Sequence, residues 1–148
     1  MLKVGDKFTF QSRMDAEKVQ LFADVSGDHN PLHLDAEFAA KSMFKRRVVH
    51  GMLTASLVSA ALASMPGTVV LTRVSFDFVK PVFIDDELTA CVTVVKDEGN
   101  KLTLDAEVSN KLGMVLKGFA VVLRRTETSE RVGACSKISE GAQKADAQ

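Results

Sequence analysis

The sequence predicts an α+β domain in which a curved, five-stranded antiparallel sheet wraps around one long, buried central helix. From His50 to Met65 there is no charged side chain, apart from His50 when protonated, and apolar residues fall on every side of a helical wheel. A helix that is apolar on all sides must be buried on nearly all faces. After Pro66 and Gly67 the apolar residues recur at every second position, which is typical of strands that cover a core. We expect the sheet and, in addition, a second subunit to cover the helix.

The charge-free helix is too short for a membrane span. At about 1.5 Å per residue, residues 51–65 would extend roughly 22 Å, whereas a spanning helix needs about 20 predominantly apolar residues. Four hydroxyl side chains also interrupt it, namely Thr54, Ser56, Ser59 and Ser64. The sequence therefore predicts a core helix and no membrane partner.

The composition limits the class of protein. With 148 residues, 46% of them apolar, the chain is expected to form one domain over residues 1–125 with a single core. Nineteen Lys and Arg residues balance nineteen Asp and Glu residues, which argues against a protein that binds nucleic acid. Cys91 and Cys135 form neither a metal-binding spacing nor a disulfide framework. The N-terminus lacks a secretory pattern, so we expect a cytoplasmic protein.

Before the buried helix, the chain is expected to form one strand and two helices joined by turns. Asp15 is a helix cap, and Val19 and Phe22 lie on one apolar stripe of the helix that follows. Asn30 precedes a proline, whose ring excludes a helical conformation at residue 30. The predicted order is a strand at 8–11, a helix over 15–26, a tight turn at 28–33, a short helix at 35–40 and a basic connection over 41–47.

After the buried helix, four antiparallel strands are expected. The stretch from Val115 to Leu123 is apolar on both faces, which predicts a strand that is either central or packed against a second subunit. Residues 126–148 have hardly any bulky apolar side chain and are expected to form a disordered tail. The remaining strands are predicted by alternation over 73–78, 88–94 and 102–108, the last two as a hairpin.

Asp28 and His33 are the first candidates for chemistry. They flank the turn that Asn30 and Pro31 impose, so a carboxylate and an imidazole can converge there. Such a pair suits the binding and deprotonation of one water molecule. In the alternative interpretation, Asp28 caps the turn and His33 is merely packed. Spacing alone does not separate these two interpretations.

Gly51 is the second candidate, because it begins the buried helix. The first amides of a helix have no partner within it, and the helix dipole adds positive charge there. Without a side chain, Gly51 would allow a ligand oxygen to approach its N–H closely, and such a contact could polarise a thioester carbonyl. The alternative is a glycine that is needed only for close packing.

Other polar residues near these positions admit simpler interpretations. A metal site would combine Asp28, His33 and His50, with His29 as an additional candidate ligand, but the spacings match no common zinc pattern, so no metal is expected. His29 is expected to be solvated, and His50 to hydrogen-bond the backbone. The basic residues could contact phosphates or simply form a solvated face; they are Lys41, Lys45, Arg46 and Arg47.

The stretch from Phe22 to His33, which contains Ser-Gly-Asp-His-Asn-Pro-Leu-His, is followed by Ala39 and by Val-His-Gly-Met at residues 49–52. Together these segments resemble the signature of the MaoC-like (R)-specific enoyl-CoA hydratases, the hydratase 2 group, which have the hot-dog fold. The similarity continues through residues 76–82 and covers most of residues 5–125.

The resemblance implies reversible addition of water to a trans-2-enoyl-CoA to give the (R)-3-hydroxyacyl-CoA. It makes Asp28 and His33 the catalytic pair that holds the water, with the Gly51 amide as the donor to the thioester carbonyl. No cofactor is implied, because coenzyme A is part of the substrate. A homodimer with the acyl tunnel at its interface is also implied. The candidate substrate-binding residues are Asn30, His50, Met52, Arg46 and Arg47.

Three further functions fit the same residues. The first is a 3-hydroxyacyl-carrier-protein dehydratase of fatty-acid synthesis, and the second is a non-catalytic subunit that binds acyl thioesters. The third is thioester hydrolysis on the same fold. Which member of the Asp28 and His33 pair removes the proton of the water stays open. Side chains that either line an acyl pocket or belong to the core are Met43, Phe44, Met52, Leu57, Met65 and Phe83.

Overall fold

A computed structural model describes residues 1–125 of the protein. The predicted tail, residues 126–148, lies outside the described residues. In chain order the elements are β1 (Lys7–Arg13), α1 (Ala16–Ser26), α2 (Pro31–Leu34), α3 (Ala36–Lys41), α4 (Gly51–Ala63), β2 (Thr68–Phe78), β3 (Glu87–Asp97), β4 (Lys101–Asn110) and β5 (Gly113–Arg125).

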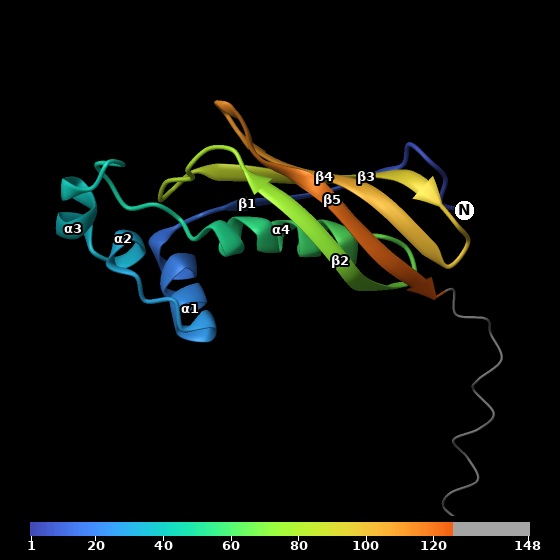
Figure 1. Ribbon diagram of the computed structural model, residues 1–148, viewed down its shortest axis with the longest axis horizontal. Helices are drawn as coiled ribbons and strands as arrows, with labels where there is room; N and C mark the ends of the chain where they lie inside the picture. The colour runs from blue at the N-terminus through green and yellow to red at the C-terminus, as the bar shows by residue number, and fades with distance from the viewer. Residues whose placement is uncertain (126–148) are drawn as a thin grey trace, which may run out of the picture.

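The five strands form one antiparallel sheet in the order β1-β3-β4-β5-β2. The sheet curves around α4, and α1, α2 and α3 gather at the end where α4 begins (Figure 1). The predicted hairpin is present, with Ala106 of β4 opposite Val92 of β3. β5 lies between β4 and β2, so the prediction of a central strand is confirmed. This is the hot-dog fold that the sequence predicts.

The core lies between α4 and the concave face of the sheet. Along β3 the side chains alternate between buried and less buried, and Ala90, Val92 and Val94 are fully buried. Val58 and Leu62 of α4 pack into the same cluster. No helix of residues 1–125 has the length and apolar character needed to cross a membrane.

The sheet covers most of α4, as predicted, but one stripe of the helix is exposed in the single chain, although its composition is as free of charge as the rest. Within residues 1–125 this stripe points away from the sheet and has no cover, and its predicted burial by a second subunit stays a prediction. The residues of this stripe are Met52, Ser56, Ser59 and Ala63.

The prediction that β2 has one face on a core is only partly right. Phe76 packs against the core, but Val74 and Phe78 are 43% and 53% exposed. The physical reason is that β2 is an edge strand at the border of the area that α4 covers. The exposed apolar residues of β2 and of the segment after it are Val70, Leu71, Val74, Phe78 and Val79.

The predicted turn at 28–33 contains a short helix instead of a turn alone. Pro31 is the first residue of α2, a position where its missing N–H costs nothing. Residue 30 is non-helical, as predicted, and the Asn30 side chain caps α2 by accepting a hydrogen bond from the Leu32 N–H at 3.1 Å. The predicted helix at 35–40 is confirmed as α3, with Asp35 as its cap.

Gly118 allows β2 to lie against β5, because a Cβ atom at this position would overlap the Ser75 carbonyl group. We expect Gly118→Ala to push β2 away from β5 and to lower the free energy of unfolding by about 1–3 kcal/mol, the usual cost of overpacking. Urea denaturation measures this change. Lys117→Ala, an exposed neighbour on β5, is the control and should unfold like the parent. Equal unfolding midpoints for the two variants would contradict the prediction.

Candidate active site

The loop between α1 and α2 positions Asp28. Gly27 ends α1 in a left-handed conformation, with φ of +80°, and its N–H donates to the Ala23 carbonyl. The Asp28 Oδ1 atom then accepts a hydrogen bond from the Asn30 N–H at 3.2 Å. Asp28 therefore does cap the turn, as the simpler interpretation predicts. Its second oxygen, Oδ2, takes no part in that cap.

His33 lies on α2, and its side chain is only 13% exposed. Its Nδ1 atom is 2.7 Å from the Val48 carbonyl oxygen. Because a carbonyl can only accept, Nδ1 carries the proton, and the Nε2 atom of the neutral ring has a free lone pair. Nε2 is 3.8 Å from Asp28 Oδ2, which is too far for a direct hydrogen bond. One water molecule can donate a hydrogen bond to each of these two atoms.

Gly51 is the first residue of α4, and its amide forms no hydrogen bond within residues 1–125. It lines a mostly apolar cavity of about 330 Å³. A Cβ atom on Gly51 would lie 3.1 Å from the ring of Phe78, so this ring packs closely on the glycine. Other residues that line the cavity are Leu32, Phe44, Val48, Thr54 and Lys80. Of the six predicted acyl-pocket residues, Phe44 lines this cavity.

His50 is buried beside the pair, with 1% exposure. Its Nε2 atom is 3.0 Å from the Asp28 carbonyl oxygen, which confirms the predicted hydrogen bond to the backbone. Its ring stacks on His33 with 3.9 Å between the ring centroids, and Phe22 packs at 4.9 Å. Burial lowers the pKa of His50 below its ordinary value of 6.5, and the hydrogen bond to Asp28 opposes this without overcoming it.

Asp28, His33 and His50 place possible metal-ligand atoms within 4.8 Å of one another. The geometry nevertheless suits a metal poorly. The His50 Nε2 atom is used by the Asp28 carbonyl, and its Nδ1 atom is buried. The rings of His33 and His50 are stacked with 30° between their planes, so their lone pairs do not converge on one point. The arrangement favours acid and base chemistry over metal binding.

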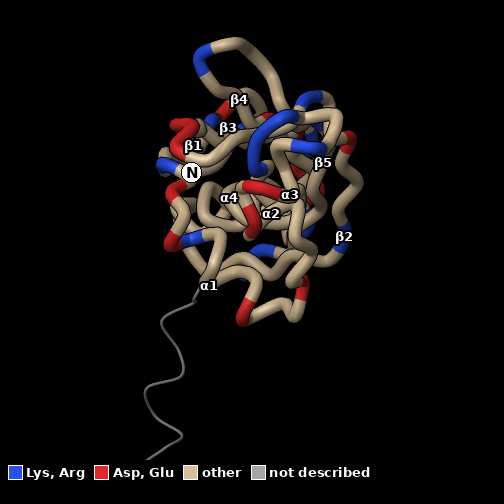
Figure 2. The backbone as a smooth tube through the Cα atoms, turned by 90° about the vertical axis from the view of Figure 1, so that its left-hand side faces the viewer, with Lys and Arg blue, Asp and Glu red and all other residues tan. Residues whose placement is uncertain are grey.

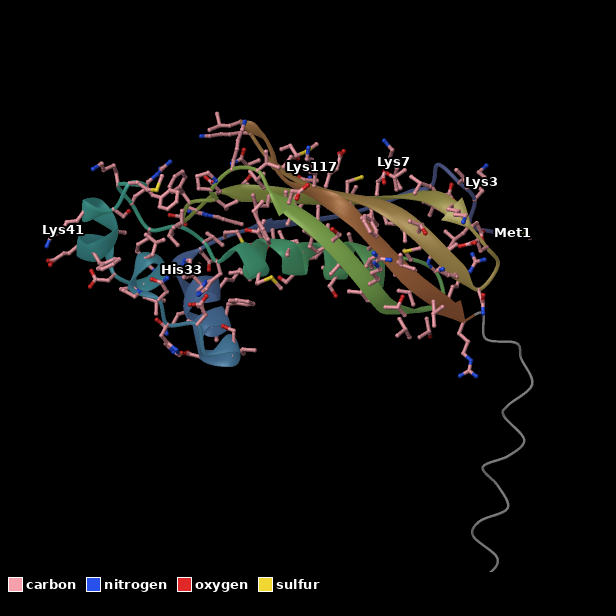
Figure 3. The ribbon with its side chains drawn as sticks, in the orientation of Figure 1. Met1, Lys3, Lys7, His33, Lys41 and Lys117 are labelled. Atoms are coloured by element: carbon pink, nitrogen blue, oxygen red, sulfur yellow. The ribbon has the colours of Figure 1, made fainter. Side chains whose placement is uncertain are left out.

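The remaining candidates lie at different places around the pair of Asp28 and His33. Arg47 is close to the pair, because its Nε atom donates to the His33 carbonyl oxygen at 2.7 Å. Arg46 lies over the Phe83 ring at 3.7 Å, and Met52 is 64% exposed beside Gly51. Figure 2 looks at this end of the molecule, where α2 and α3 lie in front of α4. Lys41 points away from His33 at the far end of α3 (Figure 3).

Sequence reasoning missed the positions of Phe22, Val48 and Phe78 in the site. The helical stripe and the strand pattern place Phe22 and Phe78 in elements, and the family resemblance includes both segments, but none of these indicates that either ring lies in the site. Val48 acts through its backbone carbonyl, which leaves no signal in the side chain. His29, by contrast, lies as predicted, exposed on the loop and 3.3 Å from Asp24.

Fold and site together define a hot-dog domain with an aspartate and histidine pair beside a helix N-terminus. The sequence of residues 3–115 matches the family described as the MaoC like domain. The chain belongs to this family.

Two curated relatives and one solved structure are similar to the chain. It is 41% identical over 127 residues to an (R)-specific enoyl-CoA hydratase of Aeromonas caviae, covering 82% of this chain and 94% of the relative. It is 40% identical over 96 residues to a mitochondrial 3-hydroxyacyl-[acyl-carrier-protein] dehydratase of Arabidopsis thaliana, covering 64% and 57%. The structure of an R-hydratase from Pseudomonas aeruginosa superposes with a TM-score of 0.80 at 37% identity, covering 85% and 84%.

The lowered pKa of His50 predicts how stability depends on pH. The unfolded chain binds a proton at His50 near pH 6.5, whereas the folded chain binds it only at lower pH. Above pH 6.5, the neutral His50 should contribute its full stabilisation of the folded chain. The free energy of unfolding should therefore fall as the pH is lowered through 6.5. The ionisable groups that act on His50 are Asp28, His33 and His29.

Urea unfolding from neutrality to about pH 5 measures this dependence. We expect His50→Phe to lose less stability than the parent over this range, because its side chain does not titrate. His29→Gln removes an exposed histidine and should follow the parent. The prediction is wrong if His50→Phe and the parent lose stability to the same extent.

Proposed function

We propose that the protein is an (R)-specific hydratase that adds water reversibly to a trans-2-enoyl-CoA and forms the (R)-3-hydroxyacyl-CoA. The observation that carries the proposal is the 3.8 Å gap between His33 Nε2 and Asp28 Oδ2, two free acceptors facing each other. The similarity to the Aeromonas caviae hydratase over most of both chains supports it.

In the proposed reaction, one water molecule donates hydrogen bonds to His33 Nε2 and Asp28 Oδ2. One of the two groups takes a proton while the water oxygen bonds to C3 of the enoyl group. The electrons of the C2=C3 double bond move into the thioester carbonyl, whose oxygen accepts a hydrogen bond from the Gly51 N–H. Return of a proton to C2 completes the addition of one water molecule. No oxidation state of the protein changes, so the proposal needs no cofactor beyond the coenzyme A of the substrate.

The acyl thioester is the partner in this proposal, and Arg46 and Arg47 are assigned to its phosphates. Arg47 keeps its terminal guanidinium nitrogens available while its Nε atom holds the His33 backbone. Asn30 contributes by capping α2, and Met52 lies exposed beside the donor amide. A carrier-protein thioester is the second candidate, because the Arabidopsis thaliana relative is a carrier-protein dehydratase. We place the reaction in the cytoplasm.

We also infer that two copies of the chain form a homodimer through β2. In the described part of the chain this strand has an unpaired edge, and its exposed apolar residues include Val70, Leu71 and Val74. An exposed apolar edge strand is a template for pairing with another strand. When β2 pairs with β2 of a second copy about a twofold axis, the same contact covers the β2 edge of each copy.

Loss of the enoyl absorbance of crotonyl-CoA and longer enoyl-CoAs tests the reaction. We expect Asp28→Asn and His33→Ala to lower kcat by about 10²–10⁴-fold with little change in KM, because proton transfer is lost and binding is kept. His29→Gln should match the parent. A parent without hydratase activity would contradict the proposal, and release of free thiol would identify a thioesterase instead. Turnover of matched coenzyme A and carrier-protein substrates separates the two candidate substrates.

Sedimentation equilibrium tests the dimer. We expect the parent to sediment at twice the 16.0 kDa of one chain. Val74→Lys should shift the protein toward the monomer, since it places a charge in the apolar contact of β2. Thr9→Lys, on the opposite edge strand β1, should leave the dimer intact. Dissociation by Thr9→Lys and not by Val74→Lys would move the interface to the other edge.

A further inference from the structure

We propose that His50 is a positioning residue, which holds the Asp28 loop and the His33 ring in their working places. This inference rests on the proposed function. It replaces the prediction that His50 binds substrate, because the side chain is buried under the two catalytic residues and its Nδ1 atom has no exposed surface.

The first step concerns the Asp28 loop. The hydrogen bond from His50 Nε2 to the Asp28 carbonyl joins residues that are 22 positions apart. The other hydrogen bonds of residues 27–30 within the described chain all reach residues within five positions in the sequence. Those local bonds shape the loop but do not fix it relative to α4. His50 therefore supplies the hydrogen bond that anchors the Asp28 backbone to the start of α4.

The second step concerns the His33 ring. Its Nδ1 atom is held by the Val48 carbonyl, which fixes the ring along one direction. The His50 ring covers one face of His33 at 3.9 Å, and Phe22 packs against His50. The ring of His33 cannot tilt toward α4 without displacing this stack. Two contacts thus direct the Nε2 lone pair of His33 toward Asp28, namely the hydrogen bond to the Val48 carbonyl and the stack on His50.

The third step concerns charge. His50 must donate from Nε2 to reach a carbonyl, so the neutral ring has its lone pair on Nδ1, which is buried and has no hydrogen-bond partner among residues 1–125. A buried acceptor without a partner lowers stability, so packing alone does not explain a histidine here. Burial also lowers the pKa of His50, which disfavours its protonated form beside His33. A second positive charge stacked on His33 would oppose protonation of His33.

The fourth step joins these contacts to the carbonyl donor. His50 immediately precedes Gly51, and its own carbonyl accepts from the Thr54 N–H in the first turn of α4. His50 is therefore linked to all three parts of the site. It hydrogen-bonds the Asp28 carbonyl, stacks on the His33 ring and directly precedes the Gly51 amide. Small displacements of reacting groups cost large factors in rate, up to roughly 100-fold for an error of about 1 Å.

The experiment compares three variants of the full-length protein in the hydration assay. His50→Gln can place an amide N–H near the former Nε2 position, His50→Asn reaches only the former Nδ1 position, and His50→Phe keeps a buried ring without a donor. We expect His50→Asn and His50→Phe to lower kcat by roughly 10- to 100-fold, with KM changed by less than about twofold. His50→Gln should retain several-fold more kcat than His50→Asn.

Melting temperatures of the variants separate a loss of activity from a loss of stability. His50→Phe should melt at or above the temperature of His50→Gln, because it keeps the ring packing, yet it should turn over more slowly. A merely structural role would make activity follow stability. The inference is overturned if His50→Phe keeps the kcat of the parent, or if His50→Gln and His50→Asn are equally active. An inactive parent would instead reject the proposed function, so the two failures are distinguishable.

Discussion

The site depends on the hydrogen bond between His33 Nδ1 and the Val48 carbonyl. This single contact decides which nitrogen of His33 carries the proton and therefore which one can accept a proton from water. Val48 is in turn held by the rest of the fold. Its N–H donates to the Leu32 carbonyl, and the segment pairs with Phe83, while the Val49 N–H donates to the Val82 carbonyl at 2.7 Å. The tautomer of His33 is thus set by the backbone that leads into α4.

The sequence reveals the parts of this arrangement that are local. The Asn30 and Pro31 step, the apolar helix and the β3–β4 hairpin follow from rules that act over a few residues, and all three are present. Asp28 caps the turn through Oδ1, as the simpler interpretation predicts, while its Oδ2 atom faces His33, so the cap leaves Oδ2 available for the proposed catalytic role. The spacing of residues in the sequence could not distinguish the two interpretations, because it says nothing about the separate surroundings of the two carboxylate oxygens.

The parts that could not be predicted depend on contacts between distant segments. The stack of His50 on His33 brings together α2 and the start of α4, and nothing in either segment alone indicates it. The exposure of β2 follows from its place at the edge of the sheet, whereas alternation indicates only that a strand has an apolar face. The stripe of α4 that is exposed in the single chain likewise follows from the position of the helix relative to the sheet. Strand order and edge positions are properties of the whole fold.

The buried helix also explains why the site can work. In the proposed reaction, negative charge develops on the thioester oxygen next to the amide of Gly51 and the positive end of the α4 dipole. The sides of α4 are free of charge, and the cavity at its start is lined mainly by apolar groups, so no charged side chain of α4 competes with these interactions. A charged side chain in α4 would both destabilise the core and weaken this field. The apolar composition of the helix, which predicts its burial, thus also suits the chemistry proposed at its first residue.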